Sequence, residues 1–267
     1  MGNGAGATTG VPHGENVSRG TPTAKEPTIV FIHGAGISSW MWRQQLASLV
    51  GFKGLAVELP GHGASRAPWI SVPDAADAVA RVIKNEVPGG KAHVVGLSLG
   101  GVVALQLLAQ DPDTVDQMLV SGTLATGIAG ARALAGLTAL TLPIGKLGPL
   151  VRLTAKMMAV PPEDYPSLLA DVRRLEAGPL HQMILDVTTF RPPPALAERR
   201  HPVLVVAGSK EHWKIRESVG RLVALMPNAR GGFISGGVHT WNWQWPDRFN
   251  TLVGTWFRDG LVSDVVA

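Results

Sequence analysis

The sequence predicts an α/β fold in which a mostly parallel sheet is flanked by helices and a helical segment is inserted late in the chain. Three observations predict this fold. Short β-branched runs alternate with longer amphipathic stretches, the alternation stops between residues 123 and 200, and it resumes after residue 200. Buried parallel strands read as short apolar runs, and crossover helices separate them. The 267 residues are enough for one such domain with a sizeable core.

Six strands are predicted from short apolar runs: Thr28–Ile32, Gly54–Val57, Ala92–Val95, Gln117–Val120, Val203–Ala207 and Gly232–Ile234. Helical patterns lie between or after them, several opened by a Ser or Asp that can cap a helix: Met41–Leu49, Asp74–Asn85, Leu99–Gln110, Ser218–Met226 and Pro246–Phe257.

The chain divides into three predicted parts. Residues 1–25 are rich in Gly, Thr and Pro and are expected to form a flexible leader; they lack the pattern of a secretory signal, so a cytoplasmic location is expected. Residues 26–122 and 201–267 form the α/β core, and residues 123–200 form a helical lid broken by several prolines. From Gln117 to Pro162 the chain has no Asp or Glu, but it carries four basic residues: Arg132, Lys146, Arg152 and Lys156.

Composition argues against several classes of function. The net charge of +4 comes from scattered basic residues, which argues against nucleic acid as a partner. The absence of Cys excludes disulfides and thiolate chemistry, and no metal-binding motif is present. The longest apolar region is interrupted by charged residues and proline, so no membrane span is expected. A small molecule is the expected partner, no cofactor is expected, and the oligomeric state stays open.

A serine in a glycine-rich turn is the strongest chemical signal. Gly96-Leu97-Ser98-Leu99-Gly100 matches G-x-S-x-G, the turn that places a nucleophilic serine on a sharp strand-to-helix bend. The pattern alone is weak, but here a predicted strand precedes it and a predicted helix follows it. We therefore assign Ser98 as nucleophile; an incidental glycine-rich turn is the alternative.

A serine hydroxyl needs a base to remove its proton, and the base needs a carboxylate to orient it. His239 follows the last predicted strand and precedes the last helix, which places it where strand ends converge. Glu211 follows the strand Val203–Ala207 closely and is assigned as the orienting acid. The alternatives are that Glu211 is a surface residue paired with a nearby lysine and that Glu217 takes the role.

The negative charge of a tetrahedral intermediate needs two backbone N–H donors. The turn after the first predicted strand, at Ala35, can supply one donor, and Leu99 the other. His33 and His62 are interpreted as structural residues of neighbouring loops rather than as catalytic groups.

These motifs together resemble the α/β-hydrolase superfamily. They are Phe31–Gly36, Leu59–Ser65, Gly96–Gly101, Gly208–Glu211 and Gly237–His239, and they cover most of the chain. The resemblance implies an eight-stranded, mostly parallel sheet, a helical cap after the sixth strand and no cofactor. Two departures are that the acid after the seventh strand is more often Asp than Glu, and that the residue before the nucleophile, here Leu97, is often His. Because relatives that cleave carbon–carbon bonds often have Asn there, and haloalkane or epoxide hydrolases have Asp as nucleophile, this chain looks more like a carboxylesterase.

The sequence thus favours hydrolysis of a carboxylic ester or lactone with an apolar or aromatic group. Five large side chains in the lid or near the predicted catalytic loops are assigned to substrate binding: Trp40, Trp213, Met158, Met183 and Trp241. The alternative for these residues is that they only pack the lid onto the core. The alternatives for function are a non-catalytic small-molecule receptor, or a cofactor-free lyase or oxygenase, on the same fold.

Overall fold

The computed structural model describes residues 18–19, 26–260, 262 and 265. Most of the predicted leader therefore lies outside the described residues. Within them, seven strands form one sheet in the order β1-β3-β2-β4-β5-β6-β7. The strands are β1 (Ser18–Arg19), β2 (Thr28–Ile32), β3 (Lys53–Val57), β4 (Ala92–Leu97), β5 (Val115–Ser121), β6 (Val203–Gly208) and β7 (Ala229–Ile234).

The sheet confirms the predicted fold class. All neighbouring strands pair in parallel except β1, which runs antiparallel to β3. All six predicted strands are present, and five of them extend beyond the predicted bounds. In β7, for example, Ala229 pairs with Val203, so backbone pairing rather than apolar sequence sets where that strand begins. The eighth strand implied by the family resemblance is not seen among the described residues.

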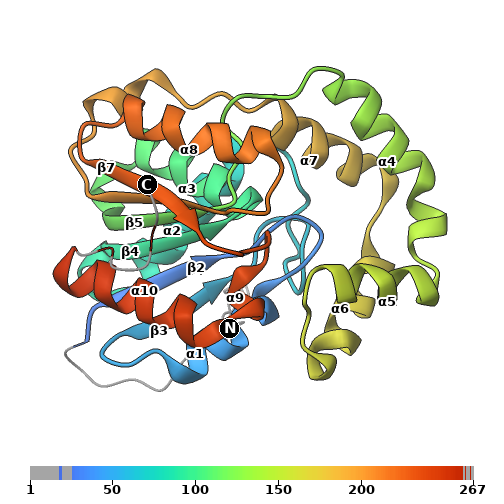
Figure 1. Cartoon of the computed structure of the whole chain (residues 1–267), viewed down its shortest axis with the longest axis horizontal. Coiled ribbons are helices and arrows are strands. Elements are labelled where there is room, and N and C mark those ends of the chain that lie inside the picture. Colours follow the sequence, from blue (N-terminus) through green and yellow to red (C-terminus); the bar gives the residue numbers. More distant parts are fainter. Residues whose placement is uncertain (1–17, 20–25, 261, 263–264, 266–267) are drawn as a thin grey trace, which may run out of the picture.

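Helices cover both faces of the sheet (Figure 1). The helices of the α/β part are α1 (Arg43–Ser48), α2 (Val72–Glu86), α3 (Leu99–Gln110), α8 (Trp213–Leu225), α9 (Trp241–Gln244) and α10 (Pro246–Asp259). Short 3-10 helices connect elements at η1 (Ser39–Trp42), η2 (Pro88–Gly90), η3 (Pro112–Thr114), η4 (Pro162–Asp164) and η5 (Pro194–Glu198). Residues of α2, α3 and α8 pack against one face of the sheet, and residues of η1, α9 and α10 pack against the other.

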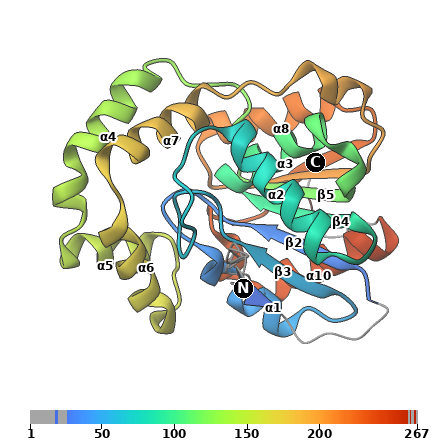
Figure 2. The ribbon, with the colours of Figure 1, turned by 180° about the vertical axis from the view of Figure 1, so that it is seen from behind.

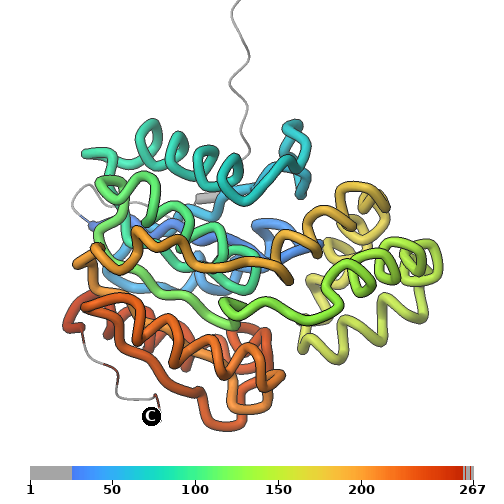
Figure 3. The backbone as a smooth tube through the Cα atoms, turned by 90° about the horizontal axis from the view of Figure 1, so that it is seen from above, coloured from blue at the N-terminus to red at the C-terminus, as the bar shows by residue number. Residues whose placement is uncertain are grey.

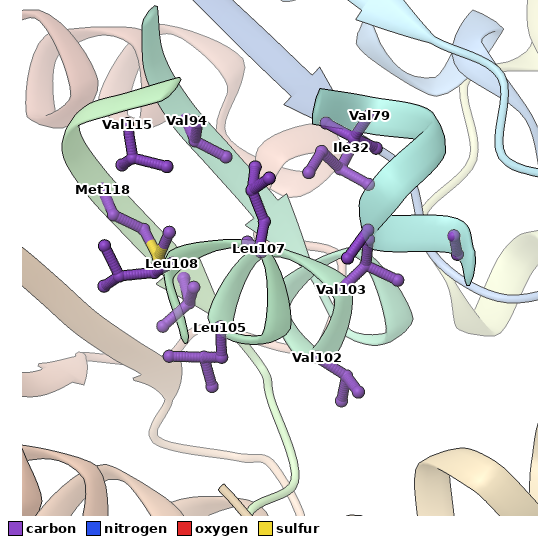
Figure 4. Packing of buried hydrophobic residues seen from close by; sticks show 14 of the residues in the cluster. Ile32, Val79, Val94, Val102, Val103, Leu105, Leu107, Leu108, Val115 and Met118 are labelled. Atoms are coloured by element: carbon purple, nitrogen blue, oxygen red, sulfur yellow. The ribbon is translucent and has the colours of Figure 1, made fainter. Parts of the chain in front are cut away.

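The hydrophobic core consists of two clusters, one on each face of the sheet, because the central strands bury side chains on both faces. In β2, Val30 and Ile32 join the cluster around α3, while Ile29 and Phe31 join the opposite cluster. This alternation follows from the two-residue period of a strand. Figure 4 shows side chains of α3 packed among residues of the strands and α2. Burying each such aliphatic side chain contributes roughly 1.5–3 kcal/mol to folding.

Four cap helices separate β5 from β6 along the chain and lie beside the α/β part in all three overall views (Figures 1, 2 and 3). They are α4 (Ala131–Gly145), α5 (Gly148–Met157), α6 (Tyr165–Arg174) and α7 (Ala177–Thr189). They fall within the predicted lid, 123–200. The boundaries 26–122, 123–200 and 201–267 remain our proposal for the domain organisation.

Two buried carboxylates hold the cap against the core. Asp171 on α6 accepts hydrogen bonds from Ser38 Oγ at 2.7 Å and from Trp40 Nε1 at 2.6 Å. Asp164 forms an ion pair with Arg43. Burial raises the pKa of Asp164, and the Arg43 guanidinium opposes that shift. Because a buried acceptor is costly to leave without its donors, these contacts fix the position of α6.

Candidate active site

Ser98 lies at the bend between β4 and α3. Its backbone has φ 59° and ψ −117°, a conformation that costs a non-glycine residue about 1–3 kcal/mol. The surrounding hydrogen bonds maintain it: Ser98 N–H donates to Ser121 O at 2.8 Å, and Ser98 O accepts from Val102 N–H at 3.1 Å. Ser98 therefore has neither strand nor helix backbone conformation and occupies the sharp bend that the sequence motif predicts.

Three glycines around Ser98 are required because other parts of the backbone and one side chain crowd them. A Cβ on Gly96 would collide with the carbonyl of Gly100, and a Cβ on Gly100 would collide with the carbonyl of Ile32. A Cβ on Gly101 would collide with Thr123 Oγ1. The turn, the helix and the first strand thus approach more closely than any side chain would allow.

Glu211 and His239 come together from two different loops. Glu211 follows β6, and its side chain is 1% exposed. Its Oε1 accepts a hydrogen bond from Gly208 N–H at 2.8 Å, and its Oε2 lies 2.5 Å from His239 Nδ1. Because a carboxylate only accepts hydrogen bonds, this contact places the proton on Nδ1 and leaves the Nε2 lone pair to act as a base. The arrangement can orient an imidazole for proton transfer.

The alternatives for the acid do not fit this geometry. Glu217 lies on α8 and pairs with Lys214 at 2.9 Å and with Arg221 at 2.7 Å. The hydrogen bond from Lys214 lowers the pKa of Glu217 most, and the hydrogen bond from Arg221 lowers it further. Glu211, by contrast, is buried against His239 rather than paired with Lys214 at the surface.

Gly122 was not identified from the sequence, although it lies against the acid–base pair. It follows β5 with φ 62°, and a Cβ there would lie 2.9 Å from His239 Nδ1 and 3.2 Å from Glu211 Oε2. The residue must therefore be glycine both for its backbone conformation and for the space that His239 needs. A glycine directly after a predicted strand is too common to signal such a role.

A cavity of about 430 Å³ lies over Ser98 and His239. Both of these residues line it, so the structure brings the predicted nucleophile and base to one site. The other lining residues are Gly122, Leu124, Ile128, Leu134, Val187, Thr188, His212 and Ile215. Most of the large side chains among them are aliphatic, and several come from the cap or its flanks. The cavity suits an apolar group held next to Ser98.

None of the five residues predicted to bind substrate belongs to this lining. Trp40 is buried and stacks on Trp243, and Trp241 is buried with its Nε1 donating to Ser121 Oγ at 2.9 Å. Met183 is also buried in the core, and Met158 is half-buried. For these four residues the geometry agrees with the packing alternative.

Trp213 is different, because the residue is 56% exposed and the Lys214 ammonium lies 4.2 Å from the centre of its ring. It follows His212, which does line the cavity. The cavity beside Ser98 is lined instead by the aliphatic side chains named above.

The two proposed oxyanion donors flank Ser98. Leu99 is the first residue of α3, and the first N–H groups of a helix have no acceptor within it. Ala35 lies in the turn that follows Gly34, and a Cβ on Gly34 would sit 3.6 Å from Ser98 Cβ. The turn therefore runs directly beside the nucleophile, as the assignment requires.

His33 and His62 are structural, as interpreted from the sequence. His33 accepts a hydrogen bond from Leu59 N–H at 3.1 Å through Nε2, and its Nδ1 lies 2.8 Å from Gly34 O. His62 accepts from Gly36 N–H at 3.3 Å through Nε2, and its Nδ1 lies 3.0 Å from Pro60 O. Burial lowers the pKa of both imidazoles, so they stay neutral and hold the loops on either side of Ala35.

The described residues contain no group of three or more His, Asp or Glu side chains arranged to hold a metal ion.

Comparison with known proteins shows the family to which the chain belongs. A sequence model described as the alpha/beta hydrolase family matches residues 29–252. The chain belongs to this alpha/beta hydrolase family. A pimeloyl-[acyl-carrier protein] methyl ester esterase of Neisseria meningitidis is 30% identical over 208 residues, which cover 68% of this chain and 75% of that protein.

Two further comparisons agree with the family. An esterase of Mycobacterium tuberculosis is 33% identical over 128 residues, which cover 43% of this chain and 41% of that protein, so the match spans less than half of its length. The solved structure of a hydrolase from Pseudomonas aeruginosa superposes with a TM-score of 0.74 at 22% identity, covering 93% of this chain and 96% of that one. At this identity the structural likeness shows the fold.

Proposed function

We propose that this alpha/beta hydrolase is a carboxylic ester hydrolase that works through an acyl-enzyme on Ser98. The observation that carries the proposal is that Ser98 and His239 line one cavity while the buried Glu211 orients the imidazole. The names of the relatives support the same reaction class, because two of them are esterases.

In this mechanism Ser98 Oγ attacks the ester carbonyl while His239 Nε2 takes its proton. The Ala35 and Leu99 N–H groups donate to the oxyanion of the tetrahedral intermediate. His239 then returns the proton to the leaving alcohol, and the acyl group stays on Ser98. A water molecule then attacks the acyl-enzyme while His239 takes its proton. The bond between the acyl group and Ser98 Oγ breaks, His239 returns the proton to Oγ, and the carboxylic acid is released.

The cavity walls indicate the kind of ester. Leu124, Ile128, Val187 and Ile215 present aliphatic surface next to Ser98, and the volume of about 430 Å³ has room for a medium-length chain or a ring. Removing such a group from water contributes about 25 cal/mol per Å² of apolar area buried. Esters with a larger apolar acyl group are therefore expected to react faster than acetate esters of the same alcohol.

The test is hydrolysis of aryl esters of graded chain length by the wild type, by Ser98→Ala and by Ser48→Ala. Ser48 lies on α1, where its hydroxyl donates to Gln44 O, so it is a control outside the site. Loss of activity in Ser98→Ala alone, with an unchanged circular dichroism spectrum, is expected. A fluorophosphonate should label the wild type and the Ser48→Ala protein but not the Ser98→Ala protein.

Other outcomes would contradict the proposal. Binding of esters without turnover or labelling would favour the receptor alternative. Activity whose products are not an acid and an alcohol would favour a lyase or oxygenase.

A further inference from the structure

The cap carries a concentration of exposed aliphatic side chains. Eight of the eleven large apolar residues that are exposed in the described part of the chain lie on α4, α5 or the turn between them. They are Leu134, Leu137, Leu140, Ile144, Leu147, Leu150, Leu153 and Met157, and we call this set the cap apolar face. Leu140 and Met157 are 77% and 73% exposed. Exposed apolar side chains concentrated on two consecutive helices in this way indicate an interaction site.

The spacing of these residues gives each helix one outward apolar stripe. From Leu134 to Ile144, and again from Leu147 to Met157, successive members of the set are three, three and four residues apart. This spacing keeps the side chains on one side of a helix. The opposite sides are occupied, because α4 packs against α7 and α5 packs against α6. The exposed stripes are thus not the core faces of these helices.

Taken alone, neither helix could cross a bilayer. Among the described residues no single helix is long and apolar enough for that. Taken together, α4 and α5 have the length and apolar composition of a membrane span, but the two helices are bent by 119° relative to each other. A bent pair with one apolar side and one packed side is suited to lying in the interface of a membrane.

The positive charge of α4 and α5 favours a negatively charged partner. Arg132, Arg152 and Lys156 are exposed on the same two helices, and no Asp or Glu occurs between Gln117 and Pro162. The segment that forms the face thus carries positive charge and no carboxylate of its own. An anionic lipid surface offers both the apolar layer and the negative charge.

The face also reaches the catalytic cavity. Leu134 belongs to the cap apolar face and is one of the residues that line the cavity with Ser98 and His239. Leu134 therefore joins the cap apolar face to the lining of the cavity.

We propose that the cap apolar face docks onto a bilayer that contains anionic lipid, with α4 and α5 lying in the headgroup region. Arg132, Arg152 and Lys156 then contact the lipid phosphates. Docking in this way presents the cavity to esters dissolved in the bilayer, and this last step rests on the proposed esterase function. The docking itself does not depend on the proposed esterase function.

The experiment measures co-sedimentation of the full chain with vesicles, in the Ser98→Ala background so that catalysis does not affect the result. The probes are phosphatidylcholine vesicles with and without phosphatidylglycerol. We expect binding to the phosphatidylglycerol vesicles that weakens as salt is added. The triple variant Leu140→Gln, Leu153→Gln and Met157→Gln should bind at least about tenfold more weakly.

Val50→Gln with Ile70→Gln is the matched control, because these side chains are 79% and 62% exposed but lie outside the cap. This double variant should bind as the parent does. Lys156→Gln with Arg132→Gln should weaken binding to phosphatidylglycerol vesicles and reduce its salt dependence. Equal unfolding midpoints for all variants would establish that each is folded.

Absence of vesicle binding would overturn the proposal, and so would binding that the triple variant retains. If vesicle binding is absent, a concentration-dependent dimer, seen by analytical ultracentrifugation and abolished in the triple variant, would show that a second copy of the chain covers the face. Because the Ser98→Ala background is used throughout, failure of docking leaves the esterase proposal untouched, and a missing esterase activity leaves the docking result valid.

Discussion

Replacing Gly122 with Ala tests whether the space beside His239 is needed for activity. The added Cβ would lie 2.9 Å from His239 Nδ1 and Cε1, whereas ordinary contacts begin at 3.4 Å. The ring must therefore withdraw by about half an ångström, and misplacements approaching 1 Å cost roughly 10²-fold in rate. We expect kcat to fall roughly 10- to 100-fold with a smaller change in KM.

The same substitution also strains the backbone, because φ at Gly122 is 62°. An alanine in that conformation costs about 1–2 kcal/mol of stability wherever it occurs. Gly90→Ala is the matched control: its φ is 65°, but its Cβ would come no nearer than 3.9 Å to a described atom, Lys84 Cα. Both variants should lose similar stability in urea unfolding, and only Gly122→Ala should lose activity.

The assay is steady-state hydrolysis of an aryl ester together with urea unfolding of the three proteins. The reasoning would be refuted if Gly122→Ala kept the kcat of the wild type while losing as much stability as Gly90→Ala. It would be refuted equally if both variants lost activity to the same extent.

Two further predictions concern charge. Glu211→Gln preserves the size of the side chain but removes the charge that orients His239, so kcat should fall roughly 10³- to 10⁴-fold; a folded variant with wild-type kcat would exclude the orienting role. Stability should decrease as pH falls below 6.5, the ordinary imidazole value, because burial lowers the pKa of His33 and His62 in the folded protein, so the unfolded chain binds protons first. Urea midpoints at roughly pH 8 and pH 5.5 should drop less for His62→Gln than for the wild type, and equal drops would contradict this account.

Much of the geometry of the candidate site was predictable from the sequence because it depends on constraints between near neighbours. Gly96 and Gly100 stand at the positions where a sharp strand-to-helix turn has no space for a side chain. A serine between two such glycines is typical of a nucleophile. Parallel strands also bring their carboxyl ends to one edge of a sheet. Residues that follow β6 and β7, Glu211 and His239, could therefore be expected near Ser98 before any coordinates were considered.

The lining of the cavity could not be predicted in the same way. Trp40, Met183 and Trp241 are as apolar as Leu124, Ile128 and Ile215, and hydrophobicity does not tell which of them packs in the core and which faces the site. That choice depends on where the cap settles. The contacts that settle it join Asp171 to Ser38 across more than a hundred residues, and nothing in the local sequence marks them.

The sequence by itself determined the parallel sheet, the strained serine turn and the placement of Glu211 and His239, the proposed acid and base, at the strand ends near Ser98, because local sterics and strand order control them. Only the tertiary structure decided which side chains meet over Ser98, the tight fit of Gly122 against His239 and the outward direction of the leucines on α4 and α5. The physical reason is that burial is a property of the packed whole. A leucine in the core and a leucine on the cap surface are identical until distant segments pack around one of them.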